Sequence, residues 1–565
     1  MSIFQNPVIR GFNPDPTICV VRGPERTDYF LSTSTFEYFP GCAIYHSTDL
    51  INWVLIGHAL TRRSQVEMRT VEPGAGSWAN TLRYREKEKR FYLTTGIFQR
   101  YRPASDDRIF PRGFYIWTDN ICDSDSWSDP IYFDNPGFDQ DLFWDDATSK
   151  VYLSTTARLK DRPPGSKQKD FGIHVSEIDL ATGRTLTPPV VVRRSPYGIA
   201  EGSHIFRRGD FYYLLTAEGG TEAGHQEWIF RSRAVPDGTG GVYGPWEDRG
   251  QALWYNGPME EVQRTGHVDM FEDGNGDWWA VLLGVRPVRL ENETDVFLEP
   301  QMGRETFLVK VDWVDDWPVV NEGRNITLET NGRAKQVVQA LEQINAGDVK
   351  WRADLKREDL ELGWYQKNTP LKKCYSLTER PGHLRLYGNC YDLSWPEAPA
   401  MLLRKQSSYT ETFHAKLQFR PDQTGYEAGV VLWWSQYSYA SIGITLLQLT
   451  SGDRVRTVAC CEPTGEAGVL HRSTPLVEDT AAVEVSEVPD TAELKIEARP
   501  REYRLSLQFK NDNKPFEFSV PAAALTIMPP VGGAFCGTMF GIYSFGKGEP
   551  VLAAADFSDV FVREG

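Results

Sequence analysis

The sequence predicts an all-β protein, a five-bladed β-propeller followed by an antiparallel β-sandwich. A unit of several short strands recurs five times along the first part of the chain, and helical periodicity is almost absent there. Further on, alternating apolar strands are separated by turn-rich stretches, as is typical of a sandwich. The chain has 565 residues, 41% of them hydrophobic, which is enough for more than one packed domain.

The repeat consists of a polar or charged residue, a first strand, a turn and an apolar second strand. The second strands are expected at residues 29–33, 91–95, 151–155, 211–216 and 278–282. In a propeller, the position that leads each innermost strand lies near the central axis, so equivalent residues of all blades converge at one mouth of the channel. The residues predicted to converge are Asp15, Asn80, Asp139, Glu201 and His267.

The domain boundaries follow from the change of pattern. We expect the propeller in residues 1–327, a polar linker in residues 328–348 with a short helix over 334–346, and the sandwich in residues 349–565. Strands of the sandwich are predicted at 384–387, 412–419, 429–434, 493–497, 503–508 and 553–557.

Three carboxylates at a propeller axis call for a functional explanation, because like charges in a partly dry site repel and raise one another's pKa. Glycoside hydrolysis needs one protonated carboxyl group and one carboxylate, and a third can hold the pKa of the acid near the working pH. The residues alone leave alternatives open. Asp15 lies between two prolines, as a turn residue would, and only the repeat register selects Asp139 among several nearby aspartates.

Four segments carry a resemblance to a known family: Asn-Pro-Val-Ile-Arg-Gly-Phe-Asn-Pro-Asp-Pro at 6–16, Gly-Phe-Asp-Gln-Asp-Leu-Phe at 137–143, Ala-Glu-Gly-Ser-His-Ile at 200–205 and Gly-Arg-Glu-Thr at 303–306. With them the chain resembles glycoside hydrolase family 43, in particular its two-domain β-xylosidase and α-L-arabinofuranosidase members. The resemblance implies that Asp15 is the general base, Glu201 the general acid and Asp139 the modulator of the acid's pKa, and that the reaction inverts the anomeric configuration.

The resemblance also implies a set of sugar-binding residues. Three alternatives stay open: Phe36 and Trp78 could be core aromatics, Arg304 could form a structural salt bridge with Glu305 or Asp312, and His267 could be a hydrogen-bonded core residue. Phe36 and Trp78 would wall the pocket, Arg304 would contact sugar hydroxyls or orient a carboxylate, and Phe535 of the sandwich would complete the leaving-group side. The remaining predicted binding residues are Asn80, Thr221 and His267. Asn80 departs from the family, which commonly has a proline at that position.

The predicted function is therefore an exo-acting, inverting hydrolase that releases terminal xylose or arabinofuranose from xylo-oligosaccharides or arabinoxylan. The sequence leaves open which sugar is preferred. It also leaves open three alternatives: an endo-acting arabinanase, a non-catalytic propeller that binds sugar or protein, and a retaining fructan-active enzyme, whose two carboxyl groups would lie closer together.

Composition bears on partners and cofactors. A net charge of −16 with no basic block argues against nucleic acid, and no cysteine pair has zinc-site spacing. No cofactor is expected to be required, while a calcium or other cation near His267 stays open.

The sequence also bears on localisation. No apolar run reaches the length of a membrane span and no apolar signal core follows Met1, which predicts a cytoplasmic protein. Sequons at Asn292 and Asn325 keep secretion open, and homo-oligomerisation is undecided.

Overall fold

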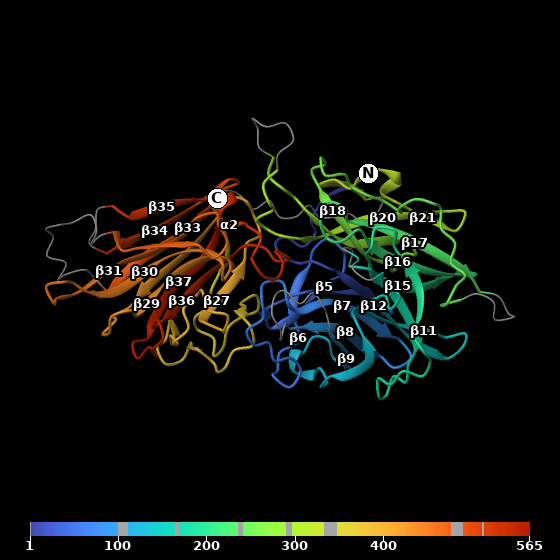
Figure 1. The fold of residues 1–565 in the computed structure, drawn as a ribbon, viewed down its shortest axis with the longest axis horizontal. Coiled ribbons are helices and arrows are strands. Elements are labelled where there is room, and N and C mark those ends of the chain that lie inside the picture. The colour runs from blue at the N-terminus through green and yellow to red at the C-terminus, as the bar shows by residue number, and fades with distance from the viewer. Residues whose placement is uncertain are drawn as a thin grey trace.

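A computed structural model describes residues 2–99, 111–163, 166, 169–234, 241–289, 297–332, 347–475, 490–510 and 514–565. These residues form two β-rich bodies that lie side by side, a propeller drawn from blue to green and a sandwich drawn mainly in orange and red (Figure 1). The predicted fold class is confirmed. The helix expected over 334–346 and the sequon at Asn292 lie outside the described residues.

Five antiparallel sheets form the blades of the propeller. Their strands, in chain order within each blade, are β2 (Thr17–Arg22), β3 (Thr27–Thr33), β5 (Gly41–Ser47) and β6 (Val54–Leu60); β7 (Gly76–Arg85), β8 (Arg90–Phe98), β9 (Arg112–Thr118) and β10 (Ile131–Pro136); β11 (Phe138–Asp145), β12 (Lys150–Arg158), β13 (Phe171–Glu177) and β14 (Val190–Arg194); β15 (Ala200–Arg208), β16 (Phe211–Glu218) and β17 (Gln226–Arg233); and β18 (Gln263–Glu272), β19 (Trp278–Val285), β20 (Glu305–Val314) and β21 (Trp317–Val320).

The first strand of each blade faces the axis. Strands β2, β7, β11, β15 and β18 contact one another in a closed ring, with β18 returning to β2. Apolar residues of neighbouring blades pack between the sheets, which is why the second strands read as almost continuous hydrophobic runs in the sequence. The ring is tied at its ends by β1 (Ser2–Gln5), which pairs with β22 (Glu329–Gly332). Two 3-10 turns, Ser124–Ser126 and Asn321–Gly323, complete this part.

The sandwich consists of an eight-stranded and a six-stranded antiparallel sheet, packed over one large apolar core. The first sheet contains β23 (Val349–Arg352), β25 (Tyr375–Ser376), β26 (Leu384–Leu386), β28 (Glu411–Gln418), β33 (Thr491–Ala498), β34 (Glu502–Phe509), β35 (Phe516–Pro521) and β37 (Ala555–Glu564). The second contains β27 (Ala400–Lys405), β29 (Glu427–Ser435), β30 (Ser438–Gln448), β31 (Arg454–Pro463), β32 (Leu470–Ser473) and β36 (Met539–Phe545). A short helix, α2 (Ala522–Leu525), follows β35.

The two bodies share an apolar interface core. Strand β4 (Tyr38–Phe39) of the propeller pairs with β24 (Gln366–Lys367), which lies in the chain between β23 and β25 of the sandwich. Around this pair, Phe12 and Phe36 of the propeller pack in one buried cluster with sandwich residues that include Trp433. The Trp433 indole donates a hydrogen bond of 3.0 Å to the Tyr38 hydroxyl. The sandwich is therefore packed against the propeller as part of one body.

Among the residues that the structure describes, no helix has the length and apolar character needed to span a membrane.

Candidate active site

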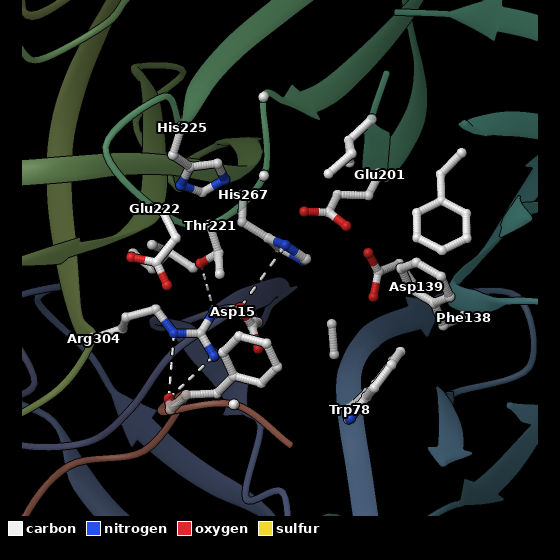
Figure 2. Close-up of a pocket in the computed structure, with 18 of the residues that line it drawn as sticks. Asp15, Trp78, Phe138, Asp139, Glu201, Thr221, Glu222, His225, His267 and Arg304 are labelled. Carbon is white, nitrogen blue, oxygen red and sulfur yellow. Dashed lines mark hydrogen bonds and ion pairs between the residues drawn. The ribbon is translucent and has the colours of Figure 1, made fainter. Parts of the chain in front are cut away.

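A pocket of about 380 Å³ opens at the propeller axis and is bounded on one side by the sandwich. Nine of the ten residues predicted for the site line it: Asp15, Phe36, Trp78, Asp139, Glu201, Thr221, His267, Arg304 and Phe535. Figure 2 shows the pocket and labels all of these except Phe36 and Phe535. Residues from all five blades and from the sandwich are thus brought to one cavity.

A recurring β-bulge aims side chains into the pocket. In β7, β11, β15 and β18 two residues stand opposite a single residue of the second strand, so that one extra residue is accommodated, at positions 78–79, 139–140, 202–203 and 267–268. Asp15 stands at the matching position two residues before Thr17, where β2 begins. Asp15, Asp139 and His267 have φ of 54°, 51° and 54°, in the left-handed region that non-glycine residues seldom adopt. Such strain is typical of functional sites.

The fourth blade uses the bulge differently. Its left-handed position, with φ of 58°, is taken by Gly202, and the carboxyl group comes from Glu201, one residue earlier. A Cβ atom at Gly202 would lie 2.9 Å from Nδ1 of His267, so a side chain has no room there. The Gly202 amide instead donates a hydrogen bond of 2.9 Å to Oδ2 of Asp139.

Asn80 does not line the pocket, contrary to the predicted register. The bulge at 78–79 places Trp78, not Asn80, in register with Asp139 and His267. Asn80 falls two residues further along, level with Asp141, and is 1% exposed. Its side-chain amide has no hydrogen-bond partner among the described residues.

The layer beneath the pocket is a buried ionic network rather than an apolar filler. The Arg83 guanidinium contacts Asp141 at 2.9 Å and Asp269 at 2.7 Å, and it lies 3.0 Å from Nδ1 of His204. The Thr17 hydroxyl donates to Asp269 at 2.9 Å. These residues join all five innermost strands around the paired charges of Arg83, Asp141 and Asp269, which fixes the blades relative to one another below the site.

Asp15 is held as a carboxylate. Burial opposes its ionisation, but the Arg304 guanidinium and the Ser34 hydroxyl outweigh this effect and lower its pKa. Arg304 Nη1 donates to Oδ1 at 3.0 Å, and Ser34 Oγ donates to Oδ2 at 2.7 Å. Arg304 also donates to Oγ1 of Thr221 at 3.1 Å, which fixes the guanidinium from a second side.

Glu201 and Asp139 have the opposite electrostatic environment. Burial raises the pKa of Glu201 to about 7; the Lys169 ammonium acts against this rise, and Asp15 adds to it. Burial and the charges of Glu201 and Asp15 raise the pKa of Asp139 well above its ordinary value. The two carboxyl groups point toward one another (Figure 2). They titrate as a pair that retains a proton at neutral pH, when Asp15 has already lost its own.

Two histidines at the site are neutral at physiological pH. Burial lowers the pKa of both His267 and His225 to about 4. His267 Nδ1 lies 3.9 Å from Oδ1 of Asp15. His225 contacts the backbone carbonyl of Arg264 at 2.9 Å and lies against Gly266, at the base of the bulge that carries His267.

The pocket walls are aromatic. Trp78 meets Phe138 edge to face at 5.1 Å, and Phe36 packs against Phe535 at 5.7 Å. Arg304 lies over Phe36 and Phe535 at 5.2 and 5.5 Å. Flat apolar faces beside a few polar groups suit the two faces of a sugar ring.

The sandwich loop that carries Phe535 is fastened to the propeller at the pocket. The Phe535 carbonyl accepts from Arg304 at 3.2 and 3.3 Å, and the Cys536 thiol donates to the buried Glu37 carboxyl at 3.3 Å. Burial raises the pKa of Glu37 to about 7. Gly303, with φ of 62°, lets the Cys536 carbonyl approach so closely that a Cβ atom would lie 2.7 Å from it.

Sequence reasoning missed several pocket residues: Phe138, Lys169, Phe171, Glu222, His225 and Met528. Phe138 directly precedes Asp139, so its position could have been inferred from the register of the bulge. Phe171 is the first residue of β13, and the others come from loops or from the sandwich; no local pattern in the sequence marks them as pocket residues.

Comparisons with known proteins agree with this geometry. The profile of Glycosyl hydrolases family 43 matches residues 4–318, and that of the "Beta xylosidase C-terminal Concanavalin A-like domain" matches residues 352–562. A non-reducing end α-L-arabinofuranosidase of Bacteroides ovatus is 30% identical over 98% of this chain and 93% of its own length. A xylan 1,3-β-xylosidase of a Vibrio species is 32% identical over 80% of each chain.

Solved structures extend the likeness to both domains. "Bacteroides ovatus Xyloglucan PUL GH43B" has a TM-score of 0.80 at 28% identity and covers 100% of both chains. A xylan β-1,4-xylosidase from Bacillus halodurans has a TM-score of 0.81 at 26% identity and covers 99% of this chain and 100% of its own. The resemblance read from the four sequence segments is confirmed: the chain belongs to glycosyl hydrolase family 43 and is a glycoside hydrolase.

Proposed function

We propose that this enzyme releases single terminal xylose or arabinofuranose units by inversion, with Asp15 as general base and Glu201 as general acid. The observation that carries the assignment is the opposite pKa shift of two carboxyl groups in one pocket, lowered for Asp15 and raised to about 7 for Glu201. An acid and a base with separated pKa values are what glycoside hydrolysis requires at neutral pH.

In this mechanism Asp15 accepts a proton from a water molecule whose oxygen attacks the anomeric carbon. Glu201 gives its proton to the glycosidic oxygen while the bond from the anomeric carbon to that oxygen breaks, so the leaving sugar departs as an alcohol. Exchange with solvent then returns Asp15 to the carboxylate and Glu201 to the acid. Asp139 supports proton uptake by Glu201, because two neighbouring buried carboxyl groups are costly to ionise together.

The shape of the pocket supports exo action. Its volume of about 380 Å³ is small, and sandwich residues that include Met528 and Phe535 bound one side. A polysaccharide chain running past both ends of the site would need an open groove. We therefore infer that a single terminal sugar enters the pocket and that the rest of the substrate lies outside it.

The choice of sugar is proposed from the relatives. Those matched over most of this chain are named α-L-arabinofuranosidase, β-xylosidase or xylosidase/arabinosidase. Both sugars are small, neutral and five-carbon, and they present similar hydroxyl groups to Arg304 and the aromatic walls. Xylo-oligosaccharides or arabinoxylan are the proposed natural substrates.

The assignment is tested on p-nitrophenyl β-D-xylopyranoside and p-nitrophenyl α-L-arabinofuranoside. Glu201→Gln and Asp15→Asn should each lower kcat by about 10²- to 10⁴-fold, as expected for the loss of a general acid or base. Glu222→Gln removes a half-exposed carboxyl at the same pocket and should keep most of the activity. The ratio of rates on the two substrates identifies the preferred sugar.

Stereochemistry is followed by proton NMR during the first turnovers. The first-formed free sugar should have the anomeric configuration opposite to that of the substrate. Retained configuration would overturn inversion, and full activity in both Glu201→Gln and Asp15→Asn would overturn the assignment of the acid and the base.

We propose that hydrolysis needs no cofactor, because the two carboxyl groups perform both proton transfers. Among the described residues no group of three or more His, Cys, Asp or Glu side chains is placed to hold a metal ion. Dialysis against a chelator should leave kcat unchanged. A loss of activity that calcium restores would instead favour a cation beside His267.

A further inference from the structure

The sandwich contacts the segment that carries Asp15 through a lysine that lies outside the pocket. Lys405, at the end of β27, extends its ammonium group 2.9 Å from the side-chain oxygen of Asn13. Asn13 lies two residues before Asp15 and is 2% exposed. Lys405 does not line the catalytic pocket.

The location of Lys405 is unfavourable for folding alone. Its ammonium lies over the rings of Phe12 and Tyr365 at 4.8 and 4.9 Å, and these cation–π contacts offset part of the cost of burying the charge. Among the described residues, however, no carboxylate forms an ion pair with it. Burial lowers its pKa to about 7. A methionine or leucine would fill the same space in this apolar interface without the cost of desolvating an amine. A lysine at this position therefore points to Asn13, with which it makes its one hydrogen bond in the described part of the chain.

Asn13 is an anchor for the segment that carries Asp15. Its side-chain oxygen accepts from the Tyr45 hydroxyl at 2.7 Å and the Thr33 hydroxyl at 3.3 Å as well as from Lys405. Its amide nitrogen donates to the carbonyl oxygens of Arg10 and Gly11. The backbone NH of Asn13 donates to the Arg304 carbonyl and its backbone C=O accepts from Thr306, so both ends of the residue are fixed.

Asp15 needs such an anchor because its backbone is strained. Its φ of 54° is unfavourable for an aspartate and persists only where the surroundings over-determine it. A base must also keep the attacking water within a narrow range of positions, and a displacement of about 1 Å can cost on the order of 10²-fold in rate.

We propose that Lys405 of the sandwich is a positioning residue for the base Asp15, acting through Asn13. The sandwich thereby holds the base from two sides, since the Phe535 carbonyl accepts from the same Arg304 that donates to Asp15. This inference rests on the proposed role of Asp15 as the general base. It makes the second domain a part of the catalytic step, in addition to its contribution to the wall of the sugar pocket.

The test compares Lys405→Met with Lys416→Met, which alters a sandwich lysine that is 42% exposed at its side chain. Lys405→Met should lower kcat by roughly ten- to a hundredfold with KM within about twofold, because the base acts in the chemical step and the walls that hold the sugar are intact. Lys416→Met should behave as wild type. Circular dichroism and thermal melting confirm that each variant is folded.

A second variant, on the propeller side of the contact, distinguishes loss of the hydrogen bond from a folding defect caused by the change at Lys405. Asn13→Ser removes the acceptor from the propeller side, together with the bonds to Tyr45 and Thr33, and should lower kcat at least as much with the same KM. The double variant should be no slower than Asn13→Ser, because that change already removes the acceptor through which Lys405 acts. Lys405→Arg, which retains a donor, should recover part of kcat.

Two outcomes overturn the proposal. One is a folded Lys405→Met enzyme with kcat within twofold of wild type. The other is a pure rise in KM, which would assign Lys405 to the shape of the pocket. Failure of the proposed function is distinguishable, because Asp15→Asn would then retain activity; if only the present inference fails, Asp15→Asn is inactive while Lys405→Met is normal.

Discussion

Asp15 and Glu201 line the same cavity, yet their carboxyl groups have opposite electrostatic surroundings. Asp15 receives a guanidinium and a hydroxyl donor, whereas no described side chain donates a hydrogen bond to Glu201, which faces a second carboxyl group. The surroundings thus shift the pKa values of two chemically similar carboxyl groups in opposite directions, as the proposed roles of base and acid require. Arg304 is the residue on which this separation depends most.

Removing Arg304 should change the pH dependence of the reaction in a defined direction. Arg304→Met takes away the positive charge that lowers the pKa of Asp15, so that pKa rises. The base is then protonated at a higher pH, and the acidic limb of the kcat/KM profile should move upward. Arg304→Lys keeps the charge and should keep the limb near its wild-type position. An unchanged limb in Arg304→Met would show that Arg304 does not control the ionisation of Asp15.

At the scale of the element, a β-bulge near the start of the innermost strand brings side chains of a blade into the pocket. It recurs in four innermost strands. In β11 and β18 its first residue, Asp139 or His267, has a left-handed conformation and lines the pocket. In the fourth blade, Gly202 occupies that position and leaves room for His267, while Glu201 enters from one residue earlier.

Gly202→Ala should therefore cost both stability and activity. A left-handed alanine costs about 1–2 kcal/mol, and its Cβ atom would also displace His267 and disturb the hydrogen bond to Asp139. Gly209→Ala is the matched control, because φ is 57° there and nothing lies within 4 Å of a Cβ atom. We expect both variants to melt at a lower temperature and only Gly202→Ala to lose kcat. Equal kcat values would mean that the site tolerates the displacement.

Glu227 in β17 should make the free energy of unfolding of the protein depend on pH. The residue is fully buried, and burial raises its pKa well above 4.5, although the backbone amides of Val268 and His267 act against this rise. The folded state therefore keeps a proton that the unfolded state releases above pH 4.5, so stability is lost as the pH rises from 4.5 toward the folded-state pKa.

Glu227→Gln should remove that loss. Its melting temperature should equal that of wild type near pH 4 and exceed it increasingly toward pH 8. Glu86→Gln, in an exposed turn, should show no such trend. A parallel pH dependence of wild type and Glu227→Gln would show that Glu227 is ionised in the folded protein.

The blades could be predicted from the sequence because each strand must bury one or both faces between neighbouring sheets, which leaves a hydrophobic pattern. The bulges could not, since only Gly202 marks one of them and Trp78-Ala79 has no turn residue. That is why the sequence placed Asn80 at the axis, two residues from the true position. The contacts of Phe535 and Lys405 with the propeller join residues several hundred positions apart, and no local pattern encodes them.

At the scale of the whole molecule, the catalytic centre spans two domains that share a buried core. Phe12 and Phe36 of the propeller pack with Trp433 of the sandwich, and Phe36 also forms the pocket wall. Because this interface is apolar and continuous with the site, the domains should unfold together in one calorimetric transition.

Phe12→Ala tests this coupling against Phe413→Ala, since both residues are 0% exposed but Phe413 lies in the core of the sandwich alone. Each truncation should cost about 3–5 kcal/mol. Phe12→Ala weakens the contact between domains, so its calorimetric trace should split into two transitions, and kcat should fall because Asn13 and Asp15 follow directly in the chain. Phe413→Ala leaves the contact between domains intact, so it should lower the temperature of the single transition and leave kcat at permissive temperature nearly unchanged. Two separate transitions in the wild-type protein would contradict the coupling. They would show that the domains unfold independently, so that the stability of the sandwich would not contribute to the position of Asp15.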